Sequence, residues 1–371
     1  MTAQRRAEPV YTISPDESVR INIWRLWMAF MVPLNHVYSS GAILTGGGES
    51  VALVAPAWFT ALQHMLITVM TRCVPCAFAL ISAVLLFRKP FDYRKNAVRK
   101  FKGLIVPLVL LTSFWIALYA IGPYVPGLRN LFSDYHSRVA DWTFEQWFTA
   151  YFGWTSKHQM PTLLYPLWFM RDLMVMNLIA PAIKWIIDRF PRLFLCVLAV
   201  MLVMKLESEF YLNSVHQVFI FFCLGYYVVK YDLHLSDLDK IPGALIAGLY
   251  LLSIVGAYLA RAHFADINAV RGIPNLLGVL FFARCCTKIP AGRFREKLLW
   301  LSSFNVTIYL FHERMLTFIK KVLIRLLPAC FPTTLALCYL LPVIISTICI
   351  SIGWFLHKYQ PRFYSLITGT R

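Results

Sequence analysis

The dominant pattern of the chain is a series of long apolar runs separated by short polar segments. Backbone groups in lipid must be satisfied within their own segment, so each run is predicted to be a helix. Each run is roughly long enough to cross a hydrocarbon core of about 30 Å, and the runs cover residues 21–44, 66–87, 103–122, 164–187, 192–206, 214–231, 241–260, 269–287, 298–324 and 334–356. The shorter apolar stretch 52–65 is interpreted as an interfacial or re-entrant helix. The pattern therefore predicts an all-α membrane protein with about ten transmembrane helices.

The charges between the apolar runs give these helices a direction. Of the 36 lysines and arginines, 23 fall in segments on one side of the predicted membrane and 9 on the other. Cytoplasmic loops carry the excess of positive charge, so both termini are predicted to be cytoplasmic. The predicted organisation is a cytoplasmic segment 1–20, a membrane domain 21–356 and a cytoplasmic tail 357–371.

Composition supports the membrane assignment and removes one class of partner. The chain is 59% hydrophobic and 15% charged, whereas soluble domains have about 45–50% apolar and about 25% charged residues. The net charge of +18 could suit nucleic acid. However, the basic residues are spread over short segments and form no basic domain, so nucleic acid is excluded and the lipid bilayer is the expected partner. The sequence shows no metal-ligand spacing, and it leaves the oligomeric state open.

Two ionisable residues lie on one face of the first apolar run. Arg25 and His36 are eleven residues apart, which is about three helical turns and about 16 Å along the axis. Ionisable residues within a membrane are costly, so they are functional candidates by default. In the alternative reading, Arg25 reaches the interface with its charged end and His36 is a buried histidine with satisfied hydrogen bonds.

Three further runs carry charges at a similar depth, which predicts a common polar cavity. Asp172 or Glu313 is expected to pair with an arginine, and a purely structural ion pair is the alternative for these groups. The residues concerned are Arg72 in the second run, Arg171 and Asp172 in the fourth, and His312, Glu313 and Arg314 in the ninth.

The segment 88–102 is interpreted as a cytoplasmic loop with seven cations and three aromatic residues. It could be an anchor against anionic lipid, or it could bind a phosphorylated ligand, since Arg and Lys bind phosphate and aromatic rings stack on bases. Charge density alone does not separate the two. If the ligand is phosphorylated, the candidate binding residues are Arg94, Arg99, Lys100 and Lys102.

Four segments, in order along the chain, resemble the motifs of the acyltransferase-3 family of polytopic membrane O-acyltransferases. They are Arg25 with His36, the aromatic-rich segment 78–87 followed by the basic segment and Pro107, the segment 167–173 (Leu-Trp-Phe-Met-Arg-Asp-Leu), and Tyr309-Leu310-Phe311-His312. One motif departs from the family pattern. The chain has Ser82-Ala83-Val84 where the family usually has Ser-Gly-Tyr or Ser-Gly-Phe, which puts in doubt any close helix approach or ligand contact made through that glycine and aromatic residue.

The resemblance implies an enzyme of the bacterial inner membrane. Such an enzyme moves an acyl group, usually acetyl, from cytoplasmic acyl-CoA to a hydroxyl of a cell-surface or periplasmic glycan or lipid-linked sugar. Acyl-CoA is then a co-substrate, and no bound cofactor or metal is expected. His36 would act as the base, because a neutral imidazole can accept a hydroxyl proton at neutral pH. Arg25 would guide the phosphate or pantetheine end of the donor.

The other intramembrane groups are candidates for contacts with the reacting atoms or the acceptor. Arg72 or Arg171 could steady the tetrahedral oxyanion, and Asp172, His312 and Glu313 are substrate-binding candidates. A multi-pass transporter or flippase for a glycan is the main rival function, since transporters also place charges around a cavity. A non-catalytic partner in an envelope-building complex is a third reading.

Overall fold

The computed structural model describes residues 11–37, 41–43, 50–52, 54–89, 92–126, 139–153, 162–203, 213–260, 269–286 and 289–369. The two strands found there, β1 (Gly41–Ile43) and β2 (Ser50–Ala52), form a short antiparallel pair. The α-helices are α1 (Pro15–Val37), α2 (Ala57–Gln63), α3 (Cys73–Phe87), α4 (Tyr93–Lys100), α5 (Val106–Ile121), α6 (Phe144–Phe152), α7 (Trp168–Arg189), α8 (Pro191–Val203), α9 (Asn213–Lys230), α10 (Gly243–Ala260), α11 (Ala269–Cys285), α12 (Arg293–Ser302), α13 (Asn305–Leu326), α14 (Phe331–Leu335), α15 (Leu341–Tyr359) and α16 (Pro361–Thr368).

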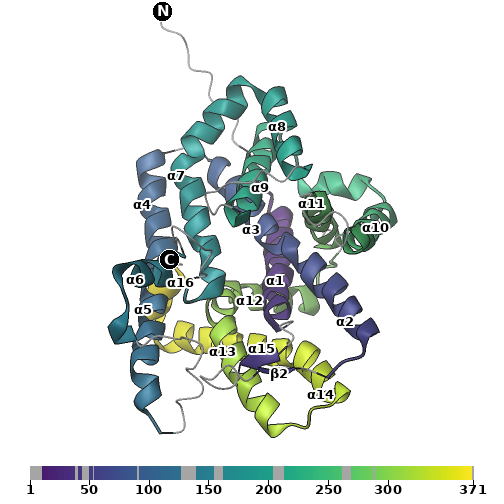
Figure 1. Ribbon diagram of the computed structural model, residues 1–371. Helices are drawn as coiled ribbons and strands as arrows, with labels where there is room; N and C mark the ends of the chain where they lie inside the picture. The colour runs from purple at the N-terminus through teal and green to yellow at the C-terminus, as the bar shows by residue number, and fades with distance from the viewer. Residues whose placement is uncertain are drawn as a thin grey trace, which may run out of the picture.

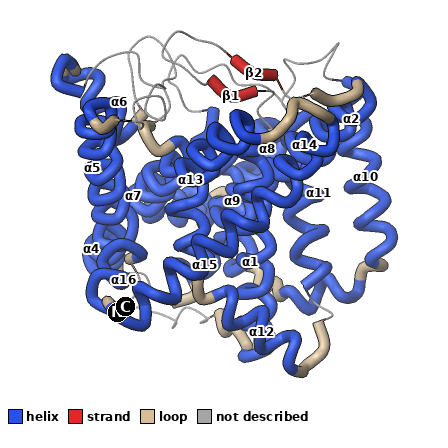
Figure 2. The backbone as a smooth tube through the Cα atoms, turned by 90° about the horizontal axis from the view of Figure 1, so that it is seen from below, coloured by secondary structure: helices blue, strands red, loops and turns tan. Residues whose placement is uncertain are grey.

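The helices form a bundle with two distinct ends (Figures 1 and 2). One end carries α4, α12 and α16, and we call it the basic end because α4 and α12 are rich in lysine and arginine. The opposite end carries α6, α14, β1 and β2, and we call it the far end. The sequence predicts that the basic end faces the cytoplasm.

Each of the ten predicted apolar runs contains a helix. Four helical stretches are long and apolar enough to cross a membrane, namely Ala57–Phe87, Tyr93–Tyr124, Gly243–Ala260 and Phe331–Tyr359. These stretches confirm the helical, membrane-type architecture. Ten crossings and cytoplasmic termini stay predictions, in part because α7 and α13 carry the charged residues that lower their hydropathy.

Two local predictions were wrong. The stretch 52–65 is not a separate interfacial helix, because the helix that begins at Ala57 runs on without a break to Phe87. No proline or glycine occurs between residues 57 and 74, so nothing ends that helix early. The segment 88–102 is not a loop either: it is a turn followed by α4. The Asp92 carboxylate accepts a hydrogen bond from the Lys95 backbone N–H at 3.0 Å and caps this helix.

Three of the long helical stretches contain a wider, π-helical turn. These turns cover His64–Val69, Phe101–Ile105 and Ala336–Leu340. Such turns are rare and occur mostly as short insertions within α-helices. The second of them joins α4 directly to α5. The basic residues of α4 therefore belong to one continuous helix that is long enough to cross a membrane.

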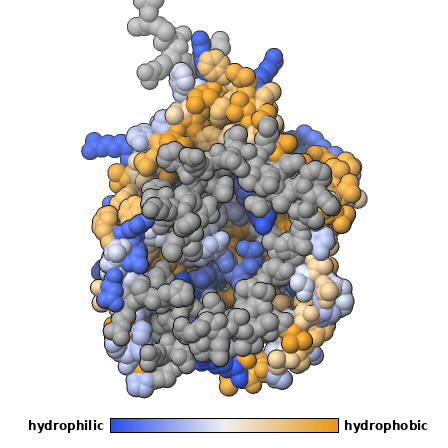
Figure 3. Space-filling model, viewed as in Figure 1, coloured by the Kyte–Doolittle hydropathy of each residue, from blue (hydrophilic) through white to orange (hydrophobic). Residues whose placement is uncertain are grey.

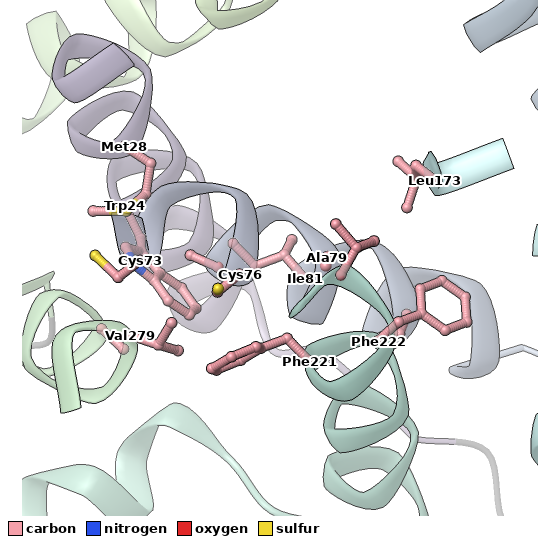
Figure 4. Close-up of a cluster of buried hydrophobic side chains, with 14 of the residues drawn as sticks. Trp24, Met28, Cys73, Cys76, Ala79, Ile81, Leu173, Phe221, Phe222 and Val279 are labelled. Atoms are coloured by element: carbon pink, nitrogen blue, oxygen red, sulfur yellow. The ribbon is translucent and has the colours of Figure 1, made fainter. Parts of the chain in front are cut away.

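The buried apolar residues fall into three main clusters. The first cluster joins α1, α3, α7, α9 and α11. The second joins α5, the N-terminal end of α7 and residues near α6, and the third joins the far half of α1 to α13, α14 and α15. Figure 4 shows part of the first cluster, with these side chains close together: Trp24, Met28, Cys73, Cys76, Phe221 and Val279.

A close helix contact in the first cluster is made at Gly225 of α9. A Cβ atom at this position would lie 2.5 Å from the Leu80 carbonyl oxygen and 2.7 Å from the Ala83 Cβ, both on α3. A close helix approach therefore exists at the motif where the sequence has Ala83 in place of the family's glycine. The glycine that permits the approach stands on the partner helix.

Candidate functional site

A hollow opens on one face of the bundle. Figure 3 shows hydrophilic residues inside a recess near the centre of the face seen in Figure 1, while hydrophobic residues form much of the outline. The side chains of Arg25, His36 and Arg72 keep partial solvent exposure, although their helices lie within the bundle. These three sequence candidates are therefore not fully enclosed by the protein, and the common polar cavity stays a prediction.

The centre of the candidate site is a pair of histidines from two helices. The rings of His36 on α1 and His312 on α13 lie 5.2 Å apart between centroids and are tilted by 41°. The Tyr165 ring meets the His36 ring edge-on at 5.5 Å. His312 is fully buried, whereas His36 is partly exposed. His36 is thus the member of the pair that a ligand in the hollow can reach.

The surroundings of His312 fix where its ring proton sits. Its Nδ1 lies 2.8 Å from the Ile308 carbonyl oxygen and 3.0 Å from the Tyr309 carbonyl oxygen. Carbonyl oxygens only accept hydrogen bonds, so Nδ1 carries the proton and the neutral ring keeps a lone pair on Nε2. Among the described residues, His312 Nε2 has no hydrogen-bond partner. The pair therefore contains a buried acceptor beside His36.

A cationic group links α4 to α1 toward the basic end. Lys100 on α4 is within electrostatic range of Arg99 and of Arg25 on α1. Arg99 also donates a hydrogen bond to the Asn96 Oδ1 at 3.0 Å. The structure therefore brings together three of the sequence candidates that come from two distant segments.

A polar cavity of about 300 Å³ adjoins this group. Arg99 is the one sequence candidate in its lining, while Arg94 and Lys102 are exposed and lie outside that lining. The sequence prediction did not single out the other cations found here. The polar lining residues are Arg88, Lys89, Asp92, Lys95, Asn96 and Arg99.

One buried and one partly buried ion pair hold the far half of the site together. The Arg171 Nε donates to the Asp172 Oδ1 at 2.7 Å, and Arg171 also donates to the Phe152 carbonyl oxygen at the end of α6. Arg314 pairs with Glu313 at 3.1 Å. The predicted pairing of Asp172 and Glu313 with arginines is thus observed.

The Arg314 pair also connects different parts of the chain. Its guanidinium donates to the Tyr119 hydroxyl at 2.9 Å and to the Leu163 carbonyl oxygen. Arg314 therefore joins α13 to α5 and to the segment before α7. Buried charges that are paired and hydrogen-bonded in this way fix the relative positions of the elements they link.

Other polar contacts connect the 3-10 turn Met70–Arg72 before α3, and also α13, to the far end of α1. The Thr71 hydroxyl, next to Arg72, donates to the Asn35 side-chain oxygen at 2.9 Å. Lys320 is 3% exposed, and its Nζ donates to the Val37 carbonyl oxygen at 3.3 Å. In the sequence, a lysine at the end of an apolar run looks the same whether it is exposed or buried.

The start of α1 is held at the basic end by His234. Its Nδ1 lies 3.1 Å from the Glu17 carboxylate, and the Tyr11 ring stacks on it at 4.9 Å. Burial alone would lower the pKa of His234, but the hydrogen bond and negative charge of Glu17, together with Asp232, outweigh it and raise the pKa above its ordinary value. This contact fixes the helix that carries Arg25 and His36.

Comparison with known proteins assigns the chain to a family. A family model described as an acyltransferase domain matches residues 18–356. The chain belongs to the acyltransferase-3 family. It is therefore a membrane acyltransferase that transfers groups other than aminoacyl groups. A curated relative, the succinoglycan biosynthesis protein ExoH of Rhizobium meliloti (strain 1021), is 24% identical over 306 residues, which cover 80% of this chain and 79% of that protein. No solved structure matches the chain significantly.

Proposed function

We propose that this acyltransferase moves an acyl group, by default acetyl, from cytoplasmic acyl-CoA to a hydroxyl of a cell-surface or periplasmic glycan. The protein would lie in a bacterial inner membrane and cross it about ten times. The observation that carries the proposal is the histidine pair within the bundle, with a cationic entrance on the basic side of the same helix α1. The name of the relative, a polysaccharide biosynthesis protein, supports a glycan acceptor.

The cationic entrance would hold the phosphate groups of the donor. Lys100 is within electrostatic range of both Arg99 and Arg25, and a cluster of like charges is favourable when an anion occupies it. The adjoining cavity of about 300 Å³ brings further cations to the same place. With the phosphates at this end, the acyl group would point along α1 toward His36, about 16 Å away.

Transfer needs one base and no covalent enzyme intermediate. The acceptor oxygen attacks the thioester carbonyl carbon while its proton passes to His36. The tetrahedral intermediate then collapses, the carbon–sulfur bond breaks, and the departing sulfur takes the proton back from His36. While His36 is protonated, its second N–H can donate to the lone pair on His312 Nε2. His312 is therefore proposed as a positioning residue for His36.

The oxyanion is assigned to Arg72 because of its place in the sequence next to Thr71. Arg171, the other candidate, directs its Nε to Asp172 and another N–H to the Phe152 carbonyl oxygen. Arg72 is partly exposed, and the neighbouring Thr71 contacts Asn35, the residue before His36. A guanidinium in this position can stabilise the charge that develops on the carbonyl oxygen.

The test is acyl transfer by detergent-solubilised protein, with labelled acetyl-CoA and a glycan isolated from cells that lack this enzyme. His36→Ala is expected to lower kcat by about 10²–10⁴-fold, the usual contribution of a general base. His357→Ala, which removes an exposed histidine near the end of α15, is the matched control. If His36→Ala transfers acetyl at the control rate, His36 is not the base.

The same experiment separates the enzyme from a transporter. In detergent there are no two compartments, so a transporter would produce no acylated glycan.

A second variant tests the positioning role of His312. His312→Ala is expected to lower kcat with little change in the KM for acetyl-CoA, because it alters the surroundings of His36 and not the donor site. It is also expected to shift the pH dependence of kcat. An unchanged pH profile would argue against the positioning role.

A further inference from the structure

Three aromatic side chains from three helices form a row beside the histidine pair. The Phe78 ring on α3 lies 6.3 Å from the Phe169 ring on α7. The Phe169 ring in turn meets the Tyr309 ring on α13 edge-on at 6.4 Å. We call these three residues the aromatic row. Their separation is typical of aromatic pairs in contact.

The aromatic row lies where the three apolar clusters meet. Phe78 packs against both the first and the third cluster, Phe169 against the first, and Tyr309 against the second. All three residues nevertheless keep partial solvent exposure. A side chain that lies between clusters does not face lipid, so this exposure opens onto the interior hollow.

The position of the aromatic row along the hollow follows from α13. Tyr309 precedes His312 by three residues, which is about 4.5 Å of helix rise on the side of the basic end. The Tyr309 hydroxyl donates to the Pro166 carbonyl oxygen, so its ring is held in place. A donor that enters at Arg25 and reaches His36 passes these rings.

We propose that the aromatic row forms one wall of a neck that selects the acyl group by its cross-section. This inference rests on the proposed transfer from acyl-CoA, because the acyl group leads when the donor enters from the basic end. A linear acyl group on the slender pantetheine arm passes flat aromatic walls, whereas a branched or ring-bearing acyl group does not. Phe78, Phe169 and Tyr309 are therefore specificity-determining residues.

The test compares transfer from acetyl-CoA, butyryl-CoA, isovaleryl-CoA and benzoyl-CoA by the full-length protein. Phe169→Ala is expected to raise the ratio of isovaleryl or benzoyl transfer to acetyl transfer by about tenfold, the scale of steric discrimination in an apolar pocket. Phe78→Trp, which narrows the neck, is expected to lower the ratio of butyryl to acetyl transfer. If Phe78 and Phe169 only packed against their neighbours, the larger side chain at 78 and the smaller one at 169 would not change these donor ratios in opposite directions.

The matched control is Phe194→Ala. Phe194 is also partly buried against the first cluster, and its ring lies 6.4 Å from the Phe219 ring in the same edge-on arrangement, but on α8 and α9. This variant should keep the wild-type ratios. Phe169→Leu keeps an apolar side chain in case the alanine variant does not fold, and it should give an intermediate ratio.

The possible outcomes separate the two proposals. If Phe169→Ala or Phe169→Leu transfers acetyl with wild-type ratios for the bulky donors, the neck is refuted and the proposed reaction stands. If the wild-type protein transfers no acyl group from acetyl-CoA or from the other donors, the proposed reaction itself fails, and the neck fails with it.

Discussion

Replacing Gly225 by alanine tests whether α3 and α9 depend on their close approach. The new Cβ would lie 2.5 Å from the Leu80 carbonyl oxygen. Ordinary contacts begin at 3.4 Å, so the two backbones must move apart by about 0.9 Å. Overpacking of this kind costs about 1–3 kcal/mol. Small residues at helix interfaces matter in membranes because they permit such packing.

The matched control is Gly248→Ala on α10, where nothing lies within 4 Å of the added atom. Both variants gain the same helix propensity from alanine, so their difference isolates the clash. Thermal unfolding of the purified protein in detergent should give a midpoint about 2–6 °C lower for Gly225→Ala than for Gly248→Ala. Equal midpoints would refute the close approach.

A second substitution asks whether the two helices share one small-residue site. The Cβ of alanine at position 225 would also lie 2.7 Å from the Ala83 Cβ. Adding Ala83→Gly to Gly225→Ala removes this contact but leaves the contact with the Leu80 carbonyl oxygen. We therefore expect partial recovery of the midpoint, with the two effects clearly non-additive. Simple additivity would contradict the shared site.

Three further outcomes are expected. Asp172→Asn removes the negative partner of Arg171 and should lower the free energy of unfolding by about 3–5 kcal/mol. This loss should appear as loss of the monodisperse peak in size-exclusion chromatography. Combining Asp172→Asn with Arg171→Met should restore the peak. Arg25→Gln should raise the KM for acetyl-CoA about tenfold and change kcat less, a loss of about 1.4 kcal/mol of binding; the reverse split would place Arg25 outside the donor site. The pKa of His234 is raised above 6.5 in the folded state. Its contribution to the free energy of unfolding should therefore be complete below pH 6.5 and fall as the pH rises through the raised pKa. The thermal unfolding midpoint of His234→Gln should lack this pH dependence.

Hydropathy located the helices because each apolar run must satisfy its backbone within lipid. It was less useful where a helix continued outside the apolar run. The basic residues of α4 were interpreted as a loop, although Asp92 before Tyr93 is a helix-capping signal that was present in the sequence. The stretch 52–65 was likewise interpreted as a separate helix because it is apolar but short and begins near Pro56.

The candidate site was predictable only in its local part. The spacing of Arg25 and His36 placed both on one face of α1, since helical periodicity is a short-range property. That His312 would be the partner of His36 depends on how α13 packs against α1, and no local pattern encodes this. The burial of Lys320 and the contact of Tyr165 with His36 are long-range results of the same kind.

The π-helical turns have a consequence for chain length. Each of the stretches Ala57–Phe87, Tyr93–Tyr124 and Phe331–Tyr359 contains one such turn, and a π-turn holds one residue more than the α-helical turn it replaces. Deleting one residue from the Phe101–Ile105 turn would therefore convert it to α-helix without changing the register of α4 against α7 or of α5 against α16. The same deletion in the middle of α9 would rotate every later side chain by about 100°. At these three turns a helix of a homologous chain can be one residue shorter and still pack in the same register.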